Sequence, residues 1–239
     1  MSALTSIEAI INRQLKRWEL EQRQPDETPS ETPRPMPIVT ISRETGSRGS
    51  YFGSRLAQRL GYQRLHREVI DAICESSGYR KRIIEALDEK HRGELQSMVE
   101  GLFTGQVVDH SDYLRQLASV LLSMVSLGGV VVMGRGANFI LGPKRGFHIR
   151  VVCPREKRIE NLQKYKEYTT EEAERVISHS DRQREEYIRK VFNADINDPL
   201  NYDLVFNSAL IDVEEMVTTA VAAIQGKMDK LTYLHHDTP

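Results

Sequence analysis

Residues 38–57 read IVTISRETGSRGSYFGSRLA, and this stretch decides the fold. It starts with an apolar, β-branched run typical of a buried strand, continues into a turn rich in glycine and serine, and ends in a segment with helical periodicity. A turn at the N-terminus of a helix presents backbone N–H groups to phosphate oxygens, and its glycines allow close approach of the backbone. The stretch therefore predicts a phosphate-binding loop, with an ordinary tight turn as the alternative.

The standard phosphate-loop motif, G-x-x-x-x-G-K-[ST], has a lysine that reaches the terminal phosphates and a hydroxyl that binds magnesium. A gap-free alignment puts Arg43 and Arg48 at the two glycine positions, Gly49 at the lysine and Ser50 at the hydroxyl. We expect Ser50 to hold Mg²⁺ and either arginine to supply the missing charge, with a bulkier, fork-shaped group. Phosphate contacts are predicted for Arg43, Gly46, Ser47, Arg48, Gly49, Ser50 and Tyr51.

The whole chain has 239 residues, enough for one globular domain with attachments. Its 33 basic and 34 acidic side chains nearly cancel, which argues against binding to nucleic acid or to a membrane surface through bulk charge. Cys74 and Cys153 lack the spacing of a zinc site or a disulfide frame. The most apolar stretch, 117–133, is interrupted by serines and a glycine pair, and the first residues lack a signal-peptide core, so we expect a cytoplasmic protein.

Four segments follow one another along the chain. The first has helical periodicity, with Ile7, Ile11, Leu15 and Trp18 on one face. The second is rich in proline and acidic residues, which is typical of a linker. We expect the amphipathic helix to pack on its own domain or to form a homodimer, with binding to a partner as the alternative. The predicted segments are an N-terminal helix at 1–23, a linker at 24–37, a domain at 38–228 and a polar tail at 229–239.

Within the domain, short apolar runs alternate with helical segments. This pattern predicts an α/β fold in which helices cover both faces of a parallel sheet, and such sheets bind ligands at the carboxyl ends of their strands. The expected strands are residues 37–42, 130–134, 147–153 and 203–207. The expected helices are residues 51–60, 67–77, 80–103, 111–127, 154–164, 169–192 and 212–228.

Four separated motifs resemble those of the cytidylate kinase-like family. They are ISRETGSRG at 41–49, GRGAN at 134–138, SDRQR at 180–184 and DPLNYDLVFN at 198–207. The resemblance implies a three-layer P-loop NTPase-like fold with a parallel sheet and added helical substrate and lid segments. It also implies ATP and Mg²⁺ as cofactors and transfer of the ATP γ-phosphate to a nucleoside monophosphate or a similar small acceptor. Such transfer depends mostly on positioning and charge neutralisation.

The same resemblance suggests roles for individual residues. It implies that Arg182 and Arg184 act in catalysis, and that Arg135, Asn138, Asp181 and Arg189 bind the substrate. A catalytic role for Arg48 is predicted from the missing loop lysine instead. In the family's kinases an aspartate follows the arginine that corresponds to Arg135, whereas the present chain has Gly136 there. From the residues alone, Arg135 could form a structural ion pair, Asn138 could cap a turn, and residues 178–190 could be a solvated charged helix in which Asp181 and Arg184 pair.

Three functions remain open on the sequence alone. The first is a nucleoside monophosphate kinase-like enzyme whose partner is a small-molecule nucleotide. The second is a nucleotide-binding sensor or scaffold with little or no catalysis, which the missing lysine and the N-terminal arm favour. The third is a kinase with another small acceptor, which Gly136 favours.

Overall fold

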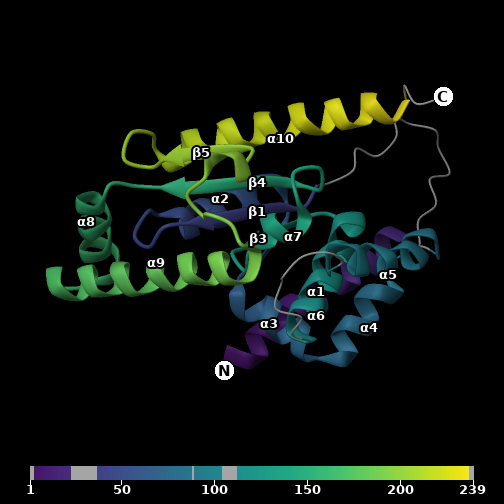
Figure 1. The fold of residues 1–239 in the computed structure, drawn as a ribbon. Coiled ribbons are helices and arrows are strands. Elements are labelled where there is room, and N and C mark those ends of the chain that lie inside the picture. Colours follow the sequence, from purple (N-terminus) through teal and green to yellow (C-terminus); the bar gives the residue numbers. More distant parts are fainter. Residues whose placement is uncertain (1–2, 23–36, 88, 104–111, 237–239) are drawn as a thin grey trace.

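The computed structural model describes residues 3–22, 37–87, 89–103 and 112–236 (Figure 1). Within them, five parallel strands form one sheet in the order β2-β3-β1-β4-β5. Because β1 lies in the centre and all strands run the same way, the loops after β1, β3 and β4 meet at one edge. The strands are β1 (Val39–Arg43), β2 (Gln63–Leu65), β3 (Val130–Met133), β4 (Phe147–Val152) and β5 (Leu204–Asn207).

Helices cover both faces of the sheet, as the alternating pattern predicted (Figure 1). One face carries α2 (Gly49–Leu60) and α10 (Val213–His236). The opposite face carries α1 (Ala3–Gln22), α3 (Arg67–Glu75), α4 (Ser77–Glu85), α5 (Glu89–Phe103), α6 (Asp112–Leu127) and α7 (Ala137–Leu141). Beyond the carboxyl ends of the strands lie α8 (Arg155–Lys166) and α9 (Thr170–Phe192), which pack on each other.

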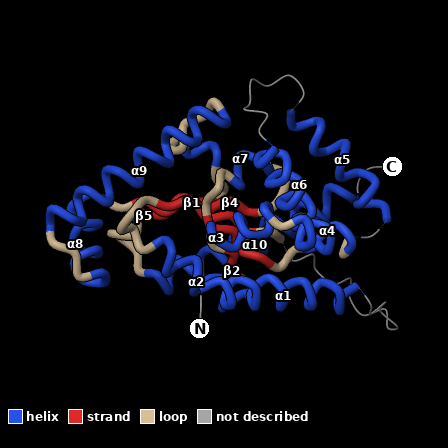
Figure 2. Tube along the Cα trace, turned by 90° about the horizontal axis from the view of Figure 1, so that it is seen from below, coloured by secondary structure: helices blue, strands red, loops and turns tan. Residues whose placement is uncertain are grey.

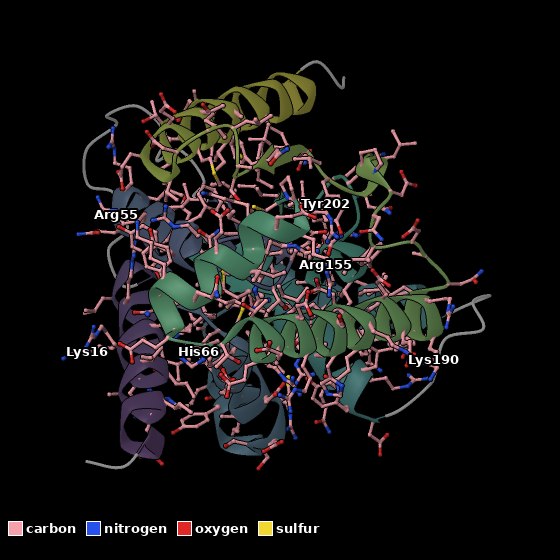
Figure 3. All side chains as sticks on the ribbon, turned by 90° about the vertical axis from the view of Figure 1, so that its left-hand side faces the viewer. Lys16, Arg55, His66, Arg155, Lys190 and Tyr202 are labelled. Carbon is pink, nitrogen blue, oxygen red and sulfur yellow. The ribbon has the colours of Figure 1, made fainter. Side chains whose placement is uncertain are left out.

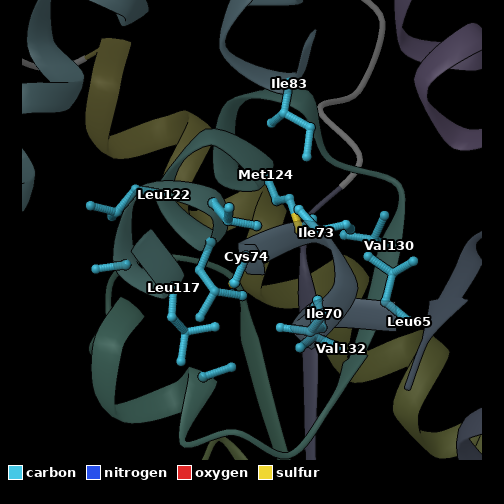
Figure 4. Packing of buried hydrophobic residues seen from close by; sticks show 14 of the residues in the cluster. Leu65, Ile70, Ile73, Cys74, Ile83, Leu117, Leu122, Met124, Val130 and Val132 are labelled. Carbon is cyan, nitrogen blue, oxygen red and sulfur yellow. The ribbon is translucent and has the colours of Figure 1, made fainter. Parts of the chain in front are cut away.

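Alternation along the central strand separates two hydrophobic cores. Val39 and Ile41 of β1 are buried against α2 and α10, whereas Ile38 belongs to the core under α6. Figure 4 shows this second core, where Val132 of β3 meets helical side chains such as Ile70. Full burial of each aliphatic side chain is worth about 1.5–3 kcal/mol relative to exposure. The two cores thus fix the sheet from both sides and hold its carboxyl edge in place.

The N-terminal helix packs on its own domain. Its predicted apolar stripe is confirmed, because Ile11, Leu15 and Trp18 are each no more than 2% exposed. Trp18 Nε1 donates a hydrogen bond to the carbonyl oxygen of Gly128 at 3.1 Å. Figure 2 shows α1 running along the side of the molecule next to β2 and α2. The apolar face of α1 is thus covered within the chain. A homodimer through this helix stays a prediction.

Several elements differ from the sequence-based expectation. The pattern missed β2 and α7, which have only three and five residues and therefore carry little periodic signal. The helix expected over residues 80–103 is two helices, α4 and α5, although neither glycine nor proline marks the break near Ala86 and Leu87. The last helix continues to His236, within the stretch 229–239 expected as a polar tail.

The predicted linker, 24–37, lies outside the described residues except for Pro37. Among the helices that the structure describes, none has the length and apolarity needed to cross a membrane.

Candidate active site

The glycine-serine turn joins β1 directly to α2 at the carboxyl edge of the sheet. Arg48 precedes α2 in the left-handed conformation, with φ of 59°. In the described part of the chain, the backbone N–H groups of Arg48, Ser50 and Tyr51 make no hydrogen bond, and the Ser50 side chain is solvent-exposed. Unpaired N–H groups at a helix N-terminus carry partial positive charge and suit phosphate oxygens.

Internal hydrogen bonds hold this loop in shape. The Ser47 hydroxyl donates to the carbonyl oxygen of Glu44 at 2.8 Å and accepts from the N–H of Gly49 at 3.3 Å. Ser47 is fully buried, and its own carbonyl oxygen accepts from the Ser208 hydroxyl at 2.8 Å. The Ser47 N–H also donates to the carbonyl oxygen of Glu44, at 3.4 Å, so both its hydroxyl and its backbone stabilise the turn, and a phosphate contact of Ser47 stays a prediction.

A cleft of about 610 Å³ lies between this loop and α8; we call it the loop cleft. Its lining consists of Arg43, Glu44, Thr45, Gly46, Arg48, Gly49, Ser50, Tyr51, Asn161, Leu162, Tyr165, Lys166 and Arg184. Arg48 lies between two aromatic rings, with its guanidinium carbon 5.1 Å from the centre of Tyr51 and 5.0 Å from that of Tyr165. Such cation–π contacts attract the guanidinium to both rings, so Arg48 links α2 to α8 across the cleft.

The carboxylate of Asp181 ties α9 to the loop. It accepts from the Thr45 N–H at 3.0 Å, from the Thr45 hydroxyl at 2.9 Å and from Arg184 Nη1 at 2.7 Å. Arg158 of α8 forms an ion pair with the same carboxylate and is only 12% exposed. The predicted Asp181–Arg184 pair is thus confirmed, and four donors converge on one carboxylate.

A second contact ties α8 to the loop. Asn161 Nδ2 donates to the carbonyl oxygen of Gly46 at 2.9 Å. Gly46 has φ of 81°, and a Cβ there would lie 2.7 Å from the backbone oxygen of Arg158. Only glycine fits this close approach. Both α8 and α9 therefore lie directly on the predicted phosphate loop.

Two arginines border both the loop cleft and a smaller neighbouring pocket, which we call the inner pocket. They are Arg43 and Arg184. Burial, together with the nearby charge of Arg184, lowers the pKa of Arg43 to about 10. Burial also lowers the pKa of Arg184, which Asp181 opposes. Two neighbouring guanidinium groups in a largely buried position create a site that favours an anion.

The inner pocket lies at the end of β3, under α9. It is lined by Ser42, Arg43, Gly134, Arg135, Gly136, Asn138, Phe139, Arg184, Tyr187, Ile188 and Ile196. Arg135 forms an ion pair with Asp71 of α3, whose other oxygen accepts from the Tyr113 hydroxyl at 2.7 Å. Two buried atoms of this pocket, Arg135 Nε and the Tyr187 hydroxyl oxygen, have no hydrogen-bond partner among the described residues. Buried polar atoms of this kind usually have a partner, and a ligand can supply one.

Arg135 and Asn138 of the GRGAN segment each had a structural role as the alternative to substrate binding. Arg135 makes the strand-end ion pair that was its structural alternative. Asn138 lies inside α7 rather than capping it, and its Nδ2 donates to the carbonyl oxygen of Asn201 at 3.4 Å. A substrate role for either residue stays a prediction.

Arg182 and Arg189, predicted for catalysis and substrate binding, do not line the loop cleft. The Arg182 side chain is 80% exposed and pairs with Glu186 at 2.8 Å. Arg182 and Arg189 line a separate surface depression on the outer side of α9. Figure 3 labels Lys190, which follows Arg189 near the end of α9 and projects outward. Roles for Arg182 in catalysis and Arg189 in substrate binding stay predictions, since neither side chain reaches the loop cleft here.

Among the residues that sequence reasoning missed are Asp71, which pairs with Arg135, and Arg158, which pairs with Asp181, as well as Asn161 and Tyr165, which line the loop cleft. The last three lie on α8, whose sequence REKRIENLQKYK is charged throughout. A pattern of this kind does not show which side chains turn toward a loop more than a hundred residues earlier. Asp71 lies on an amphipathic helix and carries no motif signal of its own.

Comparison with known proteins places the chain. A curated relative named uronate isomerase, from Corynebacterium glutamicum, is 32% identical over 119 residues, which is 49% of this chain but only 23% of that protein. The chain thus matches about a quarter of that relative's length. A solved uncharacterized protein from Eubacterium ventriosum shares the fold, with a TM-score of 0.62, 16% identity, and coverage of 80% of this chain and 99% of that one.

A more distant structural match is a gluconokinase from Sinorhizobium meliloti, with a TM-score of 0.47, 15% identity, and coverage of 85% of this chain and 99% of that one. The decisive finding is a match of residues 38–210 to a described protein family. This segment contains β1 to β5, the loop cleft and the inner pocket. Since it makes up most of the chain, the protein belongs to the cytidylate kinase-like family.

Proposed function

We propose that this protein is a nucleotide-dependent kinase that transfers the γ-phosphate of ATP to a small phosphorylated acceptor such as a nucleoside monophosphate. One observation carries the proposal: the unpaired loop N–H groups and two guanidinium groups, those of Arg43 and Arg184, border the same cleft. The acceptor, the use of a nucleotide as the small-molecule partner and a cytoplasmic location are parts of this proposal. Family membership supports its kinase character.

The two pockets suggest how donor and acceptor would be arranged. The loop cleft is large enough for a nucleotide, and the loop N–H groups would bind its phosphates. The inner pocket presents Arg135, Tyr187 and Asn138, which suit the phosphate of the acceptor. Arg43 and Arg184 border both spaces, so the phosphoryl group would pass beside them.

The chemistry is a displacement at phosphorus. An acceptor oxygen forms a bond to the γ-phosphorus, the bond to the bridging oxygen breaks, and that oxygen leaves with the electron pair as part of ADP. A phosphate dianion as acceptor needs no proton removal. The positive groups stabilise the charge that is spread over the transferred oxygens.

The residues present fit magnesium in the manner of a phosphate loop. Mg²⁺ usually keeps several waters and binds one or two protein oxygens together with substrate phosphates. The exposed Ser50 hydroxyl makes no hydrogen bond among the described residues and lies at the start of α2, beside the free N–H groups. Ser50 would hold the ion, which when bound would neutralise phosphate charge. The described residues contain no cluster of three His, Cys, Asp or Glu side chains suited to a metal, so Ser50 and the phosphates would be its ligands.

Calorimetry with Mg-ATP, followed by a turnover assay with a panel of monophosphates, tests this function. We expect ATP binding and transfer to one acceptor class. Ser50→Ala should weaken the dependence of turnover on magnesium, whereas Ser54→Ala, one turn further along α2, should not. Failure of the wild-type protein to bind ATP would refute the proposal.

A second candidate is a nucleotide-binding sensor with little catalysis. It is favoured by the direct attachment of the loop to α8 and α9 through Asp181 and Asn161. Binding of Mg-ATP without transfer to any acceptor, accompanied by a change in the conformation of these helices, would support the sensor over the kinase.

A further inference from the structure

The side chain of Arg43 occupies space that a side chain at position 49 would need. A Cβ added to Gly49 would lie 2.5 Å from the Cβ of Arg43 and 3.1 Å from its Cγ. Carbon atoms do not approach this closely, so the loop accommodates a side chain at one of these positions but not at both. The standard motif has glycine at the first position and lysine at the second. This chain has arginine at the first and glycine at the second.

The far end of Arg43 is accommodated by a second glycine. Gly134, directly after β3, has φ of 81°, and a Cβ there would lie 2.9 Å from Arg43 Nη1. The side chain therefore runs from the phosphate loop to the end of β3. Its guanidinium borders the loop cleft on one side and the inner pocket on the other.

Other arginines around these pockets already have partners. Arg158 and Arg184 pair with Asp181, and Arg135 pairs with Asp71. Arg48 is held between two tyrosine rings. For the guanidinium of Arg43, by contrast, the described residues provide no hydrogen bond and no ion pair, although Glu68 acts on it at longer range.

This lack of a partner has an energetic consequence. A largely buried cation without a partner is unfavourable, as the lowered pKa of Arg43, about 10, reflects. Arg184 adds repulsion, and both arginines border the same two pockets. An anion held between them would remove the repulsion and supply the missing partner.

We propose that Arg43 is the catalytic cation of this loop: it replaces the absent lysine from the first position of the motif and contacts the phosphoryl group in transit from ATP to the acceptor. Its guanidinium would bind γ-phosphate oxygens while the new oxygen–phosphorus bond forms and ADP leaves with the electrons of the broken bond. This inference rests on the proposed kinase function.

The experiment compares Arg43→Met and Arg43→Lys with the wild-type protein, using calorimetry for ATP and for ADP and a turnover assay. Arg43→Met should lower kcat about 100-fold or more. It should weaken ATP binding at least tenfold and leave ADP binding nearly unchanged, because the guanidinium contacts the γ-phosphate. Arg43→Lys should recover part of both losses. Arg55→Met is the matched control and should keep kcat and the preference for ATP over ADP, since that guanidinium pairs with Glu214 and lines neither pocket.

A second pair of variants tests the exchange of positions. Gly49→Lys alone should lower the melting temperature and abolish ATP binding, because its side chain overlaps Arg43. Adding Arg43→Gly places the glycine and the lysine as in the first and seventh positions of the standard motif, and it should recover both properties in part. A double variant no better folded and no better at binding ATP than Gly49→Lys would contradict the exchange.

The outcomes separate the two proposals. If the wild type binds ATP but Arg43→Met keeps its kcat and its ATP preference, the kinase proposal stands and the role of Arg43 is refuted. If the wild type binds ATP without turnover, the difference between ATP and ADP binding still decides the role of Arg43. If the wild type binds neither nucleotide, both proposals fail.

Discussion

The ring of Phe192, at the end of α9, packs directly against Gly136. A Cβ at position 136 would overlap the ring, whose Cζ would lie only 2.8 Å away. This contact leaves no room for a side chain at position 136, where the resemblance to cytidylate kinases implies an aspartate. The space for that side chain is filled, and Arg135 obtains its carboxylate partner from Asp71 on α3 instead.

We therefore expect Gly136→Ala to destabilise the protein more than a glycine substitution without a clash. Gly61→Ala is the matched control, because Gly61 has a similar φ, 67° against 64°, but no atom within 4 Å of the added Cβ. In both variants the left-handed backbone conformation should lower the unfolding free energy by about 1 kcal/mol. The clash in Gly136→Ala should lower it by about 1–3 kcal/mol more. Urea denaturation measures the difference in unfolding free energy. Phe192→Ala should reduce the extra cost, and equal costs for the two alanine variants would show that the ring can move aside freely.

The contact between Asp181 and the loop gives a second prediction. Asp181→Asn should lower the free energy of unfolding by about 3 kcal/mol, because Arg158 and Arg184 lose their charged partner in a poorly hydrated position. The exposed pair Arg182–Glu186 is a control on the same helix, and Glu186→Gln should cost less than about 1 kcal/mol. Thermal denaturation of both variants provides the comparison. A small effect for Asp181→Asn would mean that α9 is not held to the loop through this carboxylate.

Much of the fold follows from local sequence patterns, whereas much of the site does not. Short β-branched runs such as 130–133 can form only buried strands when helical segments flank them, so the sheet was predictable. The loop after β1 was predictable because glycine and serine residues between a buried strand and a helix are typical of a phosphate-binding turn. Helical periodicity puts Arg182 and Arg184 on opposite sides of α9. It does not say which side faces the loop, and the structure shows that it is the side of Arg184. Asp71 was missed because its partner Arg135 lies 64 residues away.

His148 provides a prediction about pH. This histidine is 2% exposed on β4; its Nε2 donates to the carbonyl oxygen of Gly142 at 2.9 Å, and its Nδ1 accepts from the Thr40 hydroxyl at 2.8 Å. Burial lowers its pKa below the ordinary value of 6.5; Asp203 opposes this shift, and Lys227 adds to it. Below about pH 6.5 the unfolded chain therefore binds a proton that the folded chain does not.

It follows that the unfolding free energy should fall as pH decreases from 6.5, by at most about 1.4 kcal/mol per pH unit from this group. Denaturant titrations of the wild type and of His148→Gln between pH 7.5 and 5.5 measure this slope. His148→Gln should lower stability at neutral pH but show a weaker dependence on pH. An unchanged slope in His148→Gln would assign the acid sensitivity to other groups.

The final prediction concerns the N-terminal helix, whose tryptophan is the only one in the chain. Since Trp18 is 2% exposed, its fluorescence reports directly on whether α1 is docked. Leu15→Ala removes a fully buried side chain and should cost about 2–5 kcal/mol or release the helix, with a red shift of the Trp18 emission in the latter case. Lys16→Ala, whose side chain points to solvent in Figure 3, should change neither quantity.

The emission of the wild type should also stay constant on dilution, because α1 packs within its own chain. A red shift on dilution would show instead that a second copy helps to cover this helix, as the homodimer prediction requires.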